Sequence, residues 1–262
     1  MNILDKIIEQ KKVEVAERKL LANEEQLRTA ALYKRNCFSL KQFLLDDTKT
    51  GIIAEFKRQS PSKGVINATA DVLDVTGAYT KHGASCLSVL TDEIFFGGSS
   101  NDLLRARINN IPILRKDFII DEYQIIEAKS IGADVILLIA ACLTPERVKE
   151  LALFAKSLGL EVLLEIHNEE ELQHICDETE IVGVNNRDLK TFTVDINRSL
   201  ELSKKIPADK IKVAESGISD VATIDIFKSA GFKGFLIGEN FMKAQNPTIA
   251  FAEFVNKLNA KS

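Results

Sequence analysis

Scarce cysteine, absent tryptophan and the lack of a long apolar run bound what this 262-residue chain can be. Its four cysteines, Cys37, Cys86, Cys142 and Cys176, form no CxxC pair, so the close spacing of a zinc site is missing. Cys86 and Cys142 stand inside apolar runs, where a free thiol behaves as a small hydrophobic side chain. We therefore expect reduced thiols and no bound metal ion.

Segments and charges that direct a protein to a membrane or to nucleic acid are also missing. No apolar run reaches the roughly 20 residues of a membrane-spanning helix, and the N-terminal residues MNILDK contain no apolar core of a secretion signal. The net charge is −4 and basic residues are interspersed with acidic ones, so no positive field attracts nucleic acid or anionic lipid. With 45% hydrophobic and 27% charged residues, the composition is typical of a soluble globular protein, which we expect to be cytoplasmic.

The segment before residue 49 has a helical pattern of its own. Among Lys and Glu, apolar residues recur at helical spacing at Ile3, Ile7, Ile8, Val13, Val15 and Leu20. Two further helical stretches cover residues 24–34 and 39–44. We expect this N-terminal extension, residues 1–48, to pack on the outside of the main domain.

From Gly51 onward the chain repeats a unit of one strand followed by one helix. Short β-branched or aliphatic runs predict strands at 51–56, 86–90, 111–115, 135–140, 162–166, 181–184, 212–214 and 234–237. Helical patterns lie between them at 121–131, 145–158, 169–176, 196–205 and 221–230. Helix C-terminal glycines are expected at Gly83, Gly132, Gly159 and Gly231.

This alternation predicts a parallel sheet that is covered by helices. Eight units in about 210 residues match a (β/α)8 TIM barrel, which we predict as one domain over residues 1–262, with the barrel at 49–262. Two domains are possible on length alone, and a doubly wound open sheet is the structural alternative. No glycine-rich dinucleotide fingerprint follows the first strand, which counts against the open sheet.

Charged side chains gather at the C-terminal ends of the predicted strands. Because side chains alternate between the barrel interior and the helices, parity with Ile53, Leu114 and Gly183 identifies those that face inward. The inward set contains Glu55, Lys57, Lys116, Glu165, Asn185, Arg187 and Glu215. Any one of the charged residues could be an ordinary strand-end residue paired with a helix, but a fold has no need for six at one end. Such crowding shifts pKa values and suits acid–base chemistry.

Two glycine turns in the last two units predict a phosphate site. Residues 216–220 (SGISD) and 236–240 (LIGEN) each lead from a strand into a helix, and Gly217 and Gly238 let the backbone approach an anion. Glu239 fits such a site only if its backbone N–H binds the anion while its carboxylate points away. After the first strand, residues 59–64 (QSPSKG) form either a lid over the barrel mouth or a plain surface loop.

Taken in order, these motifs resemble the indole-3-glycerol phosphate synthase family. The specific signatures are the third, LRKDFIID at 114–121, and the sixth, GVNNRDL at 183–189. The first is IAEFKRQSPSKG at 53–64, and the second joins LTD at 90–92 to FFGGS at 95–99. The set is completed by VAESGI at 213–218, which other phosphate-binding barrels share more loosely, and FLIGE at 235–239. The resemblance covers nearly the whole chain.

The resemblance implies a TIM-barrel enzyme of tryptophan biosynthesis that needs no cofactor. Its substrate, 1-(2-carboxyphenylamino)-1-deoxyribulose 5-phosphate, closes a ring onto its ketone carbon and loses carbon dioxide and water, giving indole-3-glycerol phosphate. Lys116 is then the general acid at the ketone oxygen, and Glu165 is the base or acid of the dehydration. Glu55 and Asn185 assist, and Lys57 pairs with the carboxylate or phosphate of the substrate.

The same resemblance implies which residues bind the substrate. Arg187 steadies the anthranilate part, and Phe96 and Phe118 form apolar walls against its ring. The phosphate is held through the backbone of Gly217, Gly238 and Glu239. The remaining substrate contacts that it implies are Ser60, Glu215, Ser216 and Leu236.

The residues themselves agree with this chemistry. A lysine acts as an acid near neutral pH when burial and neighbouring cations lower its pKa, and we expect Lys57 and Arg187 to do so for Lys116. Ring closure needs orientation more than a cofactor, and no metal cluster or nucleotide loop appears in the sequence. His82 and His174 are bystanders, and only His167, on the parity of Glu165, has a place near the site.

Two other functions fit part of the pattern. A sister barrel such as phosphoribosylanthranilate isomerase keeps both glycine turns, but it uses a Cys and an Asp and needs neither Lys116 nor Glu165. A non-catalytic phosphate-binding or scaffold subunit is expected to have lost at least one catalytic charge. We expect the chain to act on a small phosphorylated molecule, without nucleic acid or membrane, as a monomer or weak homodimer.

Overall fold

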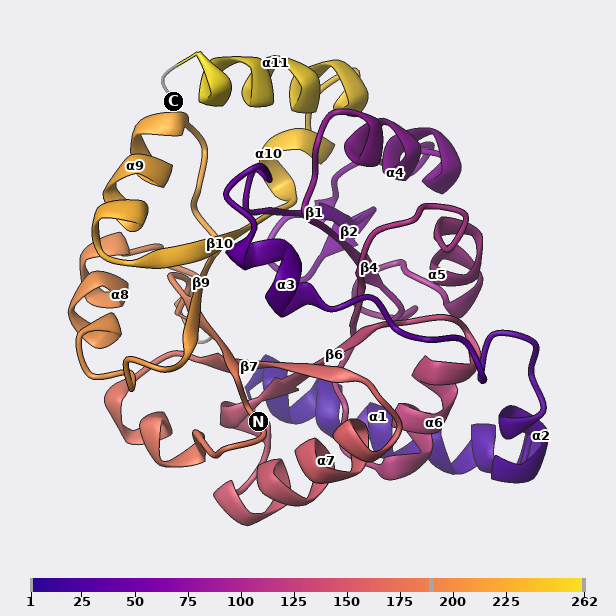
Figure 1. Cartoon of the computed structure of the whole chain (residues 1–262). Coiled ribbons are helices and arrows are strands. Elements are labelled where there is room, and N and C mark those ends of the chain that lie inside the picture. The colour runs from indigo at the N-terminus through magenta and orange to yellow at the C-terminus, as the bar shows by residue number, and fades with distance from the viewer. Residues whose placement is uncertain (1, 189–190, 261–262) are drawn as a thin grey trace.

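Eight parallel strands close into a barrel in the computed structural model, which describes residues 2–188 and 191–260. Each barrel strand pairs with its sequence neighbours, and pairing of the first with the last closes the ring (Figure 1). The barrel strands are β1 (Ile52–Phe56), β4 (Cys86–Leu90), β5 (Ile113–Lys116), β6 (Val135–Ile139), β7 (Glu161–Ile166), β8 (Ile181–Asn185), β9 (Ile211–Glu215) and β10 (Phe232–Ile237). The predicted (β/α)8 barrel is confirmed, and the open sheet is excluded.

Helices ring the barrel (Figure 1), and all except α10 (Glu239–Met242) begin at a side chain that caps the first turn, such as Asp71, Ser99 and Thr144. They are α4 (Val72–Lys81), α5 (Ser100–Ala106), α6 (Glu122–Ser130), α7 (Pro145–Ser157), α8 (Ile196–Ser203), α9 (Val221–Ser229), α10 (Glu239–Met242) and α11 (Pro247–Asn259). All four glycines expected after helices have positive φ. Leu189, which ends the sixth sequence signature, lies outside the described residues.

Two predicted helices are shorter or tighter than the sequence pattern indicated. The helix expected at 169–176 is a 3-10 helix, η2 (Glu169–His174), because Glu171 turns its carboxylate back to the main-chain N–H of His167. The helix expected at 24–34 ends early, as α2 (Glu24–Arg28), where Thr29 bonds the carbonyl of Gln26 through its hydroxyl. A 3-10 turn, η1 (Ala140–Cys142), follows β6.

The N-terminal extension covers both ends of the barrel. α3 (Leu40–Leu45) places Leu40 and Leu44 in the apolar cluster of the barrel interior, and it lies in front of the barrel in Figure 1. α1 (Ile3–Leu21) lies behind the barrel in that view, and Ile3 and Ile7 line the cavity at the far end. The extension therefore packs on the main domain from outside the ring of strands, and two of its helices close the ends of the barrel.

The buried face of α1 also differs from the predicted one. Ile7, Lys11 and Val15 are buried at a spacing of four residues, which places them on one side of the helix. Val13 and Leu20 fall on other faces, and Leu20 is 89% exposed. A lysine thus occupies the centre of the buried face, where the sequence pattern had suggested apolar residues alone.

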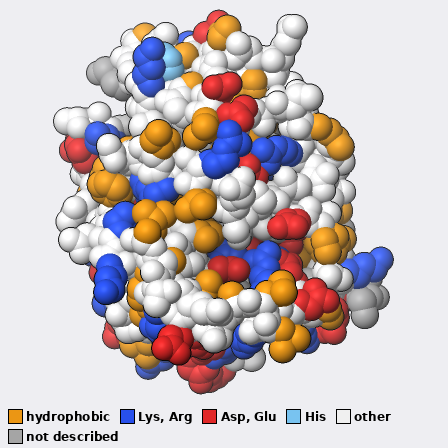
Figure 2. Space-filling model, turned by 90° about the vertical axis from the view of Figure 1, so that its right-hand side faces the viewer, with side chains coloured by type: hydrophobic (Ala, Val, Ile, Leu, Met, Phe, Trp, Pro, Cys, Tyr) orange, Lys and Arg blue, Asp and Glu red, His pale blue; other side chains and the backbone are white. Residues whose placement is uncertain are grey.

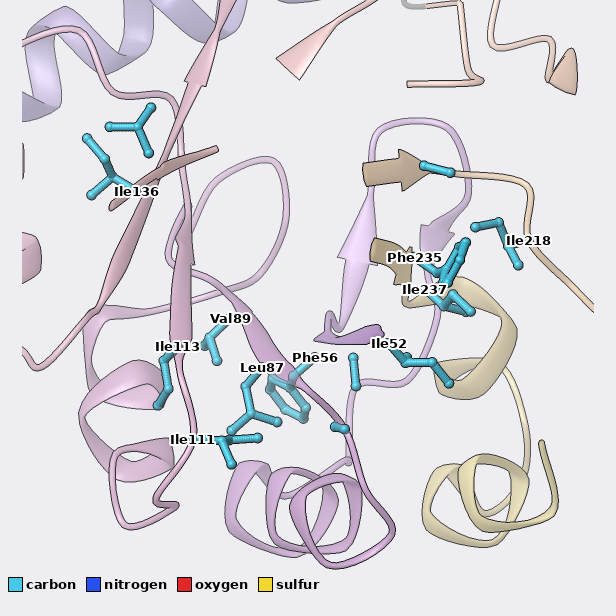
Figure 3. Packing of buried hydrophobic residues seen from close by; sticks show 14 of the residues in the cluster. Ile52, Phe56, Leu87, Val89, Ile111, Ile113, Ile136, Ile218, Phe235 and Ile237 are labelled. Carbon is cyan, nitrogen blue, oxygen red and sulfur yellow. The ribbon is translucent and has the colours of Figure 1, made fainter. Parts of the chain in front are cut away.

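Apolar side chains form two layers, one inside the strands and one between the strands and the helices. The inner layer contains Ile53 and Leu114, on the parity that the sequence predicted to face inward. The outer layer contains Ile52, Leu87 and Ile113, among the residues drawn in Figure 3. Alternation along each strand therefore sends every second side chain to the barrel axis, and these lead to the cavity at the strand ends.

The outer surface carries charges of both signs without a large field of one sign on the face that Figure 2 shows. Lys and Arg side chains alternate there with Asp and Glu, and apolar side chains are scattered between them. Within the described part of the chain, no helix has the length and apolar character to cross a membrane.

Candidate active site

A cavity of about 450 Å³ opens at the C-terminal ends of the strands. All residues that the sequence assigned to the site line it: Glu55, Lys57, Ser60, Phe96, Lys116, Phe118, Glu165, Asn185, Arg187, Glu215, Ser216, Gly217, Leu236, Gly238 and Glu239. The loop at 59–64 forms the hairpin of β2 (Gln59–Ser60) and β3 (Gly64–Val65), and its residues 60–63 line the same cavity. The structure therefore brings the residues that the sequence singled out together around one cavity.

Lys116 lies at the centre of the cavity floor between two carboxylates. Its Nζ donates to Oε2 of Glu215 at 2.8 Å and to Oε2 of Glu165 at 3.1 Å. Burial disfavours the ammonium, but the carboxylates of Glu165, Glu215 and Glu55 outweigh it and raise the pKa of Lys116 well above its ordinary value. The sequence-based expectation of a lowered pKa is wrong, because the cations expected beside Lys116 are paired elsewhere.

The two carboxylates that share Lys116 have opposite pKa shifts. Burial raises the pKa of both, but Lys116 and His167 hold the pKa of Glu165 well below its usual range. At Glu215 burial and the charge of Glu165 prevail over Lys116, and its pKa rises to about 7. Its Oε1 is buried with no hydrogen-bond partner, and a Cβ on Gly183 would come within 2.0 Å of it. Two carboxyl groups that differ in this way form an acid–base pair.

A second ion pair joins Lys57 and Glu55 at the rim of the floor. Lys57 Nζ donates to Glu55 Oε1 at 2.6 Å, and only 17% of the lysine side chain is exposed. Burial disfavours the carboxylate, but Lys57 and Lys116 lower the pKa of Glu55. Gly238 leaves room for this carboxylate, since a Cβ there would lie 2.6 Å from Oε1.

Arg187 spans the mouth between the hairpin and the last strand unit. Its Nη1 donates to Ser62 Oγ at 3.0 Å, and its Nη2 donates to Glu239 Oε2 at 3.2 Å. Lys63 Nζ lies 3.6 Å from the other oxygen of Glu239. The prediction that the Glu239 carboxylate points away from the site is wrong, because two cations of the cavity draw it inward.

The two glycine turns stand side by side at this end of the barrel. Ser216 and Gly217 both have positive φ, at 67° and 73°, and the chain then continues to α9. Gly238 is the N-cap of α10, so both predicted strand-to-helix turns are confirmed. Both turns lead into the N-terminus of a helix, where main-chain N–H groups without a helical partner favour an anion.

The two aromatic side chains of the cavity, Phe96 and Phe118, lie on the loops that follow β4 and β5, and the buried Lys11 connects these loops. The rings of Phe96 and Phe118 lie 6.0 Å apart at their centroids. The N–H of Phe96 donates to Asp92 and that of Phe118 to Asp117, and Nζ of Lys11 lies 2.9 Å from each of these two aspartates. Lys11 is 1% exposed. Sequence reasoning missed it, because a lysine among many lysines and glutamates of a helix gives no sign of burial.

Asn185 connects the catalytic floor to Arg187. Its Nδ2 donates to Glu165 Oε1 at 3.0 Å, and its Oδ1 accepts from the main-chain N–H of Arg187 at 3.0 Å. Nε2 of His167 lies 3.0 Å from the same Oε1, but His167 is not a lining residue of the cavity. Among the described residues, no group of three or more His, Cys, Asp or Glu side chains could hold a metal ion.

Comparison with known proteins gives a consistent result. A family model described as indole-3-glycerol phosphate synthase matches residues 4–254. A Bacteroides thetaiotaomicron protein named indole-3-glycerol phosphate synthase is 47% identical over 258 residues, covering 98% of this chain and 99% of that protein. Proteins of the same name from a Polaromonas species and Bordetella pertussis are 44% and 41% identical, and the alignments cover 96% and 97% of this chain and 97% and 99% of theirs.

Proposed function

The chain belongs to the indole-3-glycerol phosphate synthase family, and from that premise we propose how its residues divide the reaction. The enzyme converts 1-(2-carboxyphenylamino)-1-deoxyribulose 5-phosphate to indole-3-glycerol phosphate, with loss of carbon dioxide and water. The observation that carries our assignment is the position of Lys116 Nζ between Glu165 and Glu215. No other described lysine of the cavity floor has two buried carboxylates as partners.

Lys116 is the general acid of ring closure. The new carbon–carbon bond converts the ketone to an alkoxide, and an alkoxide is more basic than an amine. The raised pKa keeps Lys116 protonated before the reaction, and the alkoxide then takes its proton. Loss of carbon dioxide restores neutrality in the ring. Glu215, with a pKa of about 7, is able to return a proton to the lysine near neutral pH.

Glu165 takes part in the dehydration that completes the indole. Because its pKa is held low, it is ionised and ready to accept the ring proton. Lys116, reprotonated from Glu215, gives the proton with which the hydroxyl leaves as water. Asn185 fixes the orientation of Glu165, and Glu55 holds Lys57 at the rim. Lys57 pairs with an anionic group of the substrate, and Arg187 steadies the anthranilate between the walls of Phe96 and Phe118.

The phosphate is bound by main-chain N–H groups at the two glycine turns, with Ser216 beside them. We expect inorganic phosphate to compete with substrate. Gly238→Ala should weaken this competition roughly tenfold or more, about the loss of one charge-assisted hydrogen bond. Since the new Cβ would also meet Glu55, kcat should fall together with the rise in KM.

Inhibition constants for phosphate provide the measurement, and Gly77→Ala in α4 is the control, because a Cβ there meets nothing within 4 Å. An NMR titration with phosphate locates the bound anion. If the amide resonances that shift belong to residues far from Gly217 and Gly238, the proposed site is wrong.

The activity itself has a direct assay. The chain contains no tryptophan, so the indole fluorescence of the product does not overlap with tryptophan emission from the protein. Mixing the purified protein with the carboxyphenylamino substrate should give a steady rise in indole emission. A folded protein that gives none contradicts the proposed assignment of catalytic residues.

We further propose that the enzyme acts in the cytoplasm as a monomer or weak homodimer. The mixed charges of the surface in Figure 2 and the four free thiols support this proposal. Light scattering after size-exclusion chromatography at several protein concentrations measures the oligomeric state.

A further inference from the structure

His167 is a buried imidazole without a part in the steps described above. It directly follows β7 and stands two residues beyond Glu165, and it is 7% exposed. It does not line the cavity, so it does not touch the substrate. Its role must therefore pass through the groups that it contacts.

Both ring nitrogens of His167 face carboxylates. Nε2 lies 3.0 Å from Glu165 Oε1, and Nδ1 lies 3.2 Å from Glu171 Oε2. The main-chain N–H of His167 donates to that same Glu171 oxygen at 2.7 Å, which fixes the ring against η2. The Nε2 contact with Glu165 is a close ion-pair distance and not an aligned hydrogen bond. A neutral imidazole has one N–H, so its other nitrogen would turn a lone pair toward a carboxylate, whereas an imidazolium is attracted to both carboxylates.

The surroundings favour the charged ring. Burial disfavours the imidazolium, but the interactions of the ring with Glu165 and Glu171 outweigh burial and raise the pKa of His167 to about 10. A cation is thereby held beneath the cavity floor, shielded from solvent and separated from the substrate.

Glu165 is consequently enclosed from two sides. Lys116 contacts Oε2, while His167 and Asn185 both contact Oε1. Each of the two cations stabilises the ionised carboxylate, which burial alone would drive to the protonated form. If Lys116 gives its proton away during ring closure, the imidazolium is the cation that remains beside Glu165.

We propose that His167 is a positioning residue of the reaction: held between Glu165 and Glu171 as an imidazolium, it orients Glu165 and keeps it ionised while Lys116 loses its proton. The contact geometry carries this inference, which rests on the proposed role of Glu165 as the base of the dehydration. Glu171 is part of the same group of side chains, since it holds the imidazole ring in place and its negative charge offsets that of the imidazolium.

Other titratable groups face this cluster from the elements around it. Lys116 of β5 and Glu215 of β9 act on Glu165 directly. The thiol of Cys142 in η1 interacts with both Glu165 and Glu171, and Asp5 of α1 acts on that thiol. Burial raises the pKa of Cys142, so it stays neutral. Removal of His167 thus leaves Lys116 as the only cation in contact with Glu165 among the described residues.

The first test is the pH dependence of kcat/KM for wild type and His167→Gln. Glutamine keeps a hydrogen-bond donor but carries no charge. The pKa of Glu165 should rise in this variant. As the pH is lowered, the variant should therefore lose activity at a higher pH than the wild type does. We expect the acidic limb to move up by about 1 to 3 pH units. kcat should fall more than KM changes, because the substrate contacts are untouched.

His174→Gln is the matched control. His174 is 6% exposed, and its ring nitrogens lie within hydrogen-bond distance of the main-chain carbonyls of Glu171 and Leu143. Its variant should keep the acidic limb of the wild type. An unmoved limb in His167→Gln overturns the proposal, and so does an equal shift in both variants, which would mean that the segment is merely loosened.

The second test needs no substitution, so it holds if His167→Gln fails to fold. The chain has three histidines, which makes assignment of ¹⁵N-labelled imidazoles by NMR straightforward. His167 should show two protonated ring nitrogens at pH 8, and a neutral ring at that pH overturns the proposal. Glu165→Gln separates this proposal from the catalytic assignment. If Glu165→Gln keeps the kcat of the wild type, Glu165 is not the base of the dehydration, and the catalytic assignment fails. The NMR spectrum of the wild type reports the charge of His167 independently of that assignment.

Discussion

Replacing Lys116 by methionine is expected to lower kcat by roughly 10²- to 10⁴-fold, the usual contribution of a positioned general acid. Methionine keeps the apolar stem and a similar volume, so the barrel interior stays filled. Ring closure should be the step that fails, since no proton then reaches the forming alkoxide. Glu165 and Glu215 lose their shared cation, so one of them should take up a proton. Single-turnover kinetics with circular dichroism as a folding check measure the effect.

Lys57→Met is the matched comparison, because it removes a lysine from the same cavity. Lys57 pairs with Glu55 at the rim, and in the described part of the chain it forms no ion pair with Glu165 or Glu215. KM should rise more than kcat falls. If Lys116→Met keeps kcat within a few-fold of wild type while Lys57→Met does not, the acid is the other lysine.

Lys11→Met is expected to lower the free energy of unfolding by about 3–5 kcal/mol, the cost of removing one partner from a buried ion pair. Lys11 Nζ lies 2.9 Å from both Asp92 and Asp117, and the side chains of all three are almost completely buried. Without Lys11, Asp92 loses its cation, while Asp117 keeps only Arg115. Because these aspartates hold the loops of Phe96 and Phe118, KM should rise as well.

Urea unfolding of Lys11→Met and Lys12→Met measures this difference. Lys12 is the adjacent residue and pairs with Glu9, but both side chains are more than half exposed, at 59% and 60%. Its replacement should change stability by less than about 0.5 kcal/mol. Equal stability of the two variants would mean that the N-terminal helix is not anchored through Lys11.

The sequence was sufficient to predict the barrel and the polar side chains that its strands bring to the cavity, because both follow from a local rule. Alternation along a strand decides which side chains face the axis, so Ile53 identifies Glu55 and Leu114 identifies Lys116. The order of the strands in a closed barrel then brings these residues to one end without further information.

The pKa of Lys116 could not be predicted in the same way. Parity places three cations and three carboxylates at one mouth, but the sign of a pKa shift depends on which of them lies within about 4 Å. Arg187 is drawn to Glu239 and Lys57 to Glu55, so only carboxylates contact Lys116. Lys11 was missed for a related reason, since its partners Asp92 and Asp117 lie on loops whose approach to α1 no periodicity indicates.

The position of α3 has a consequence for the order of events during synthesis. This helix precedes β1 in the chain, yet its Ser39 cap and Lys41 bond Glu161 of β7, and Leu44 packs near Gly234 of β10. During synthesis α3, which closes one end of the barrel, therefore leaves the ribosome before all of the strands that it packs against, and β10 leaves last. Until β10 emerges, Leu40 and Leu44 remain without their final partners, and the loop that must close is nearly the whole chain. Docking of α3 is accordingly a late folding step, and the nascent chain carries an apolar segment for chaperones to bind while it waits.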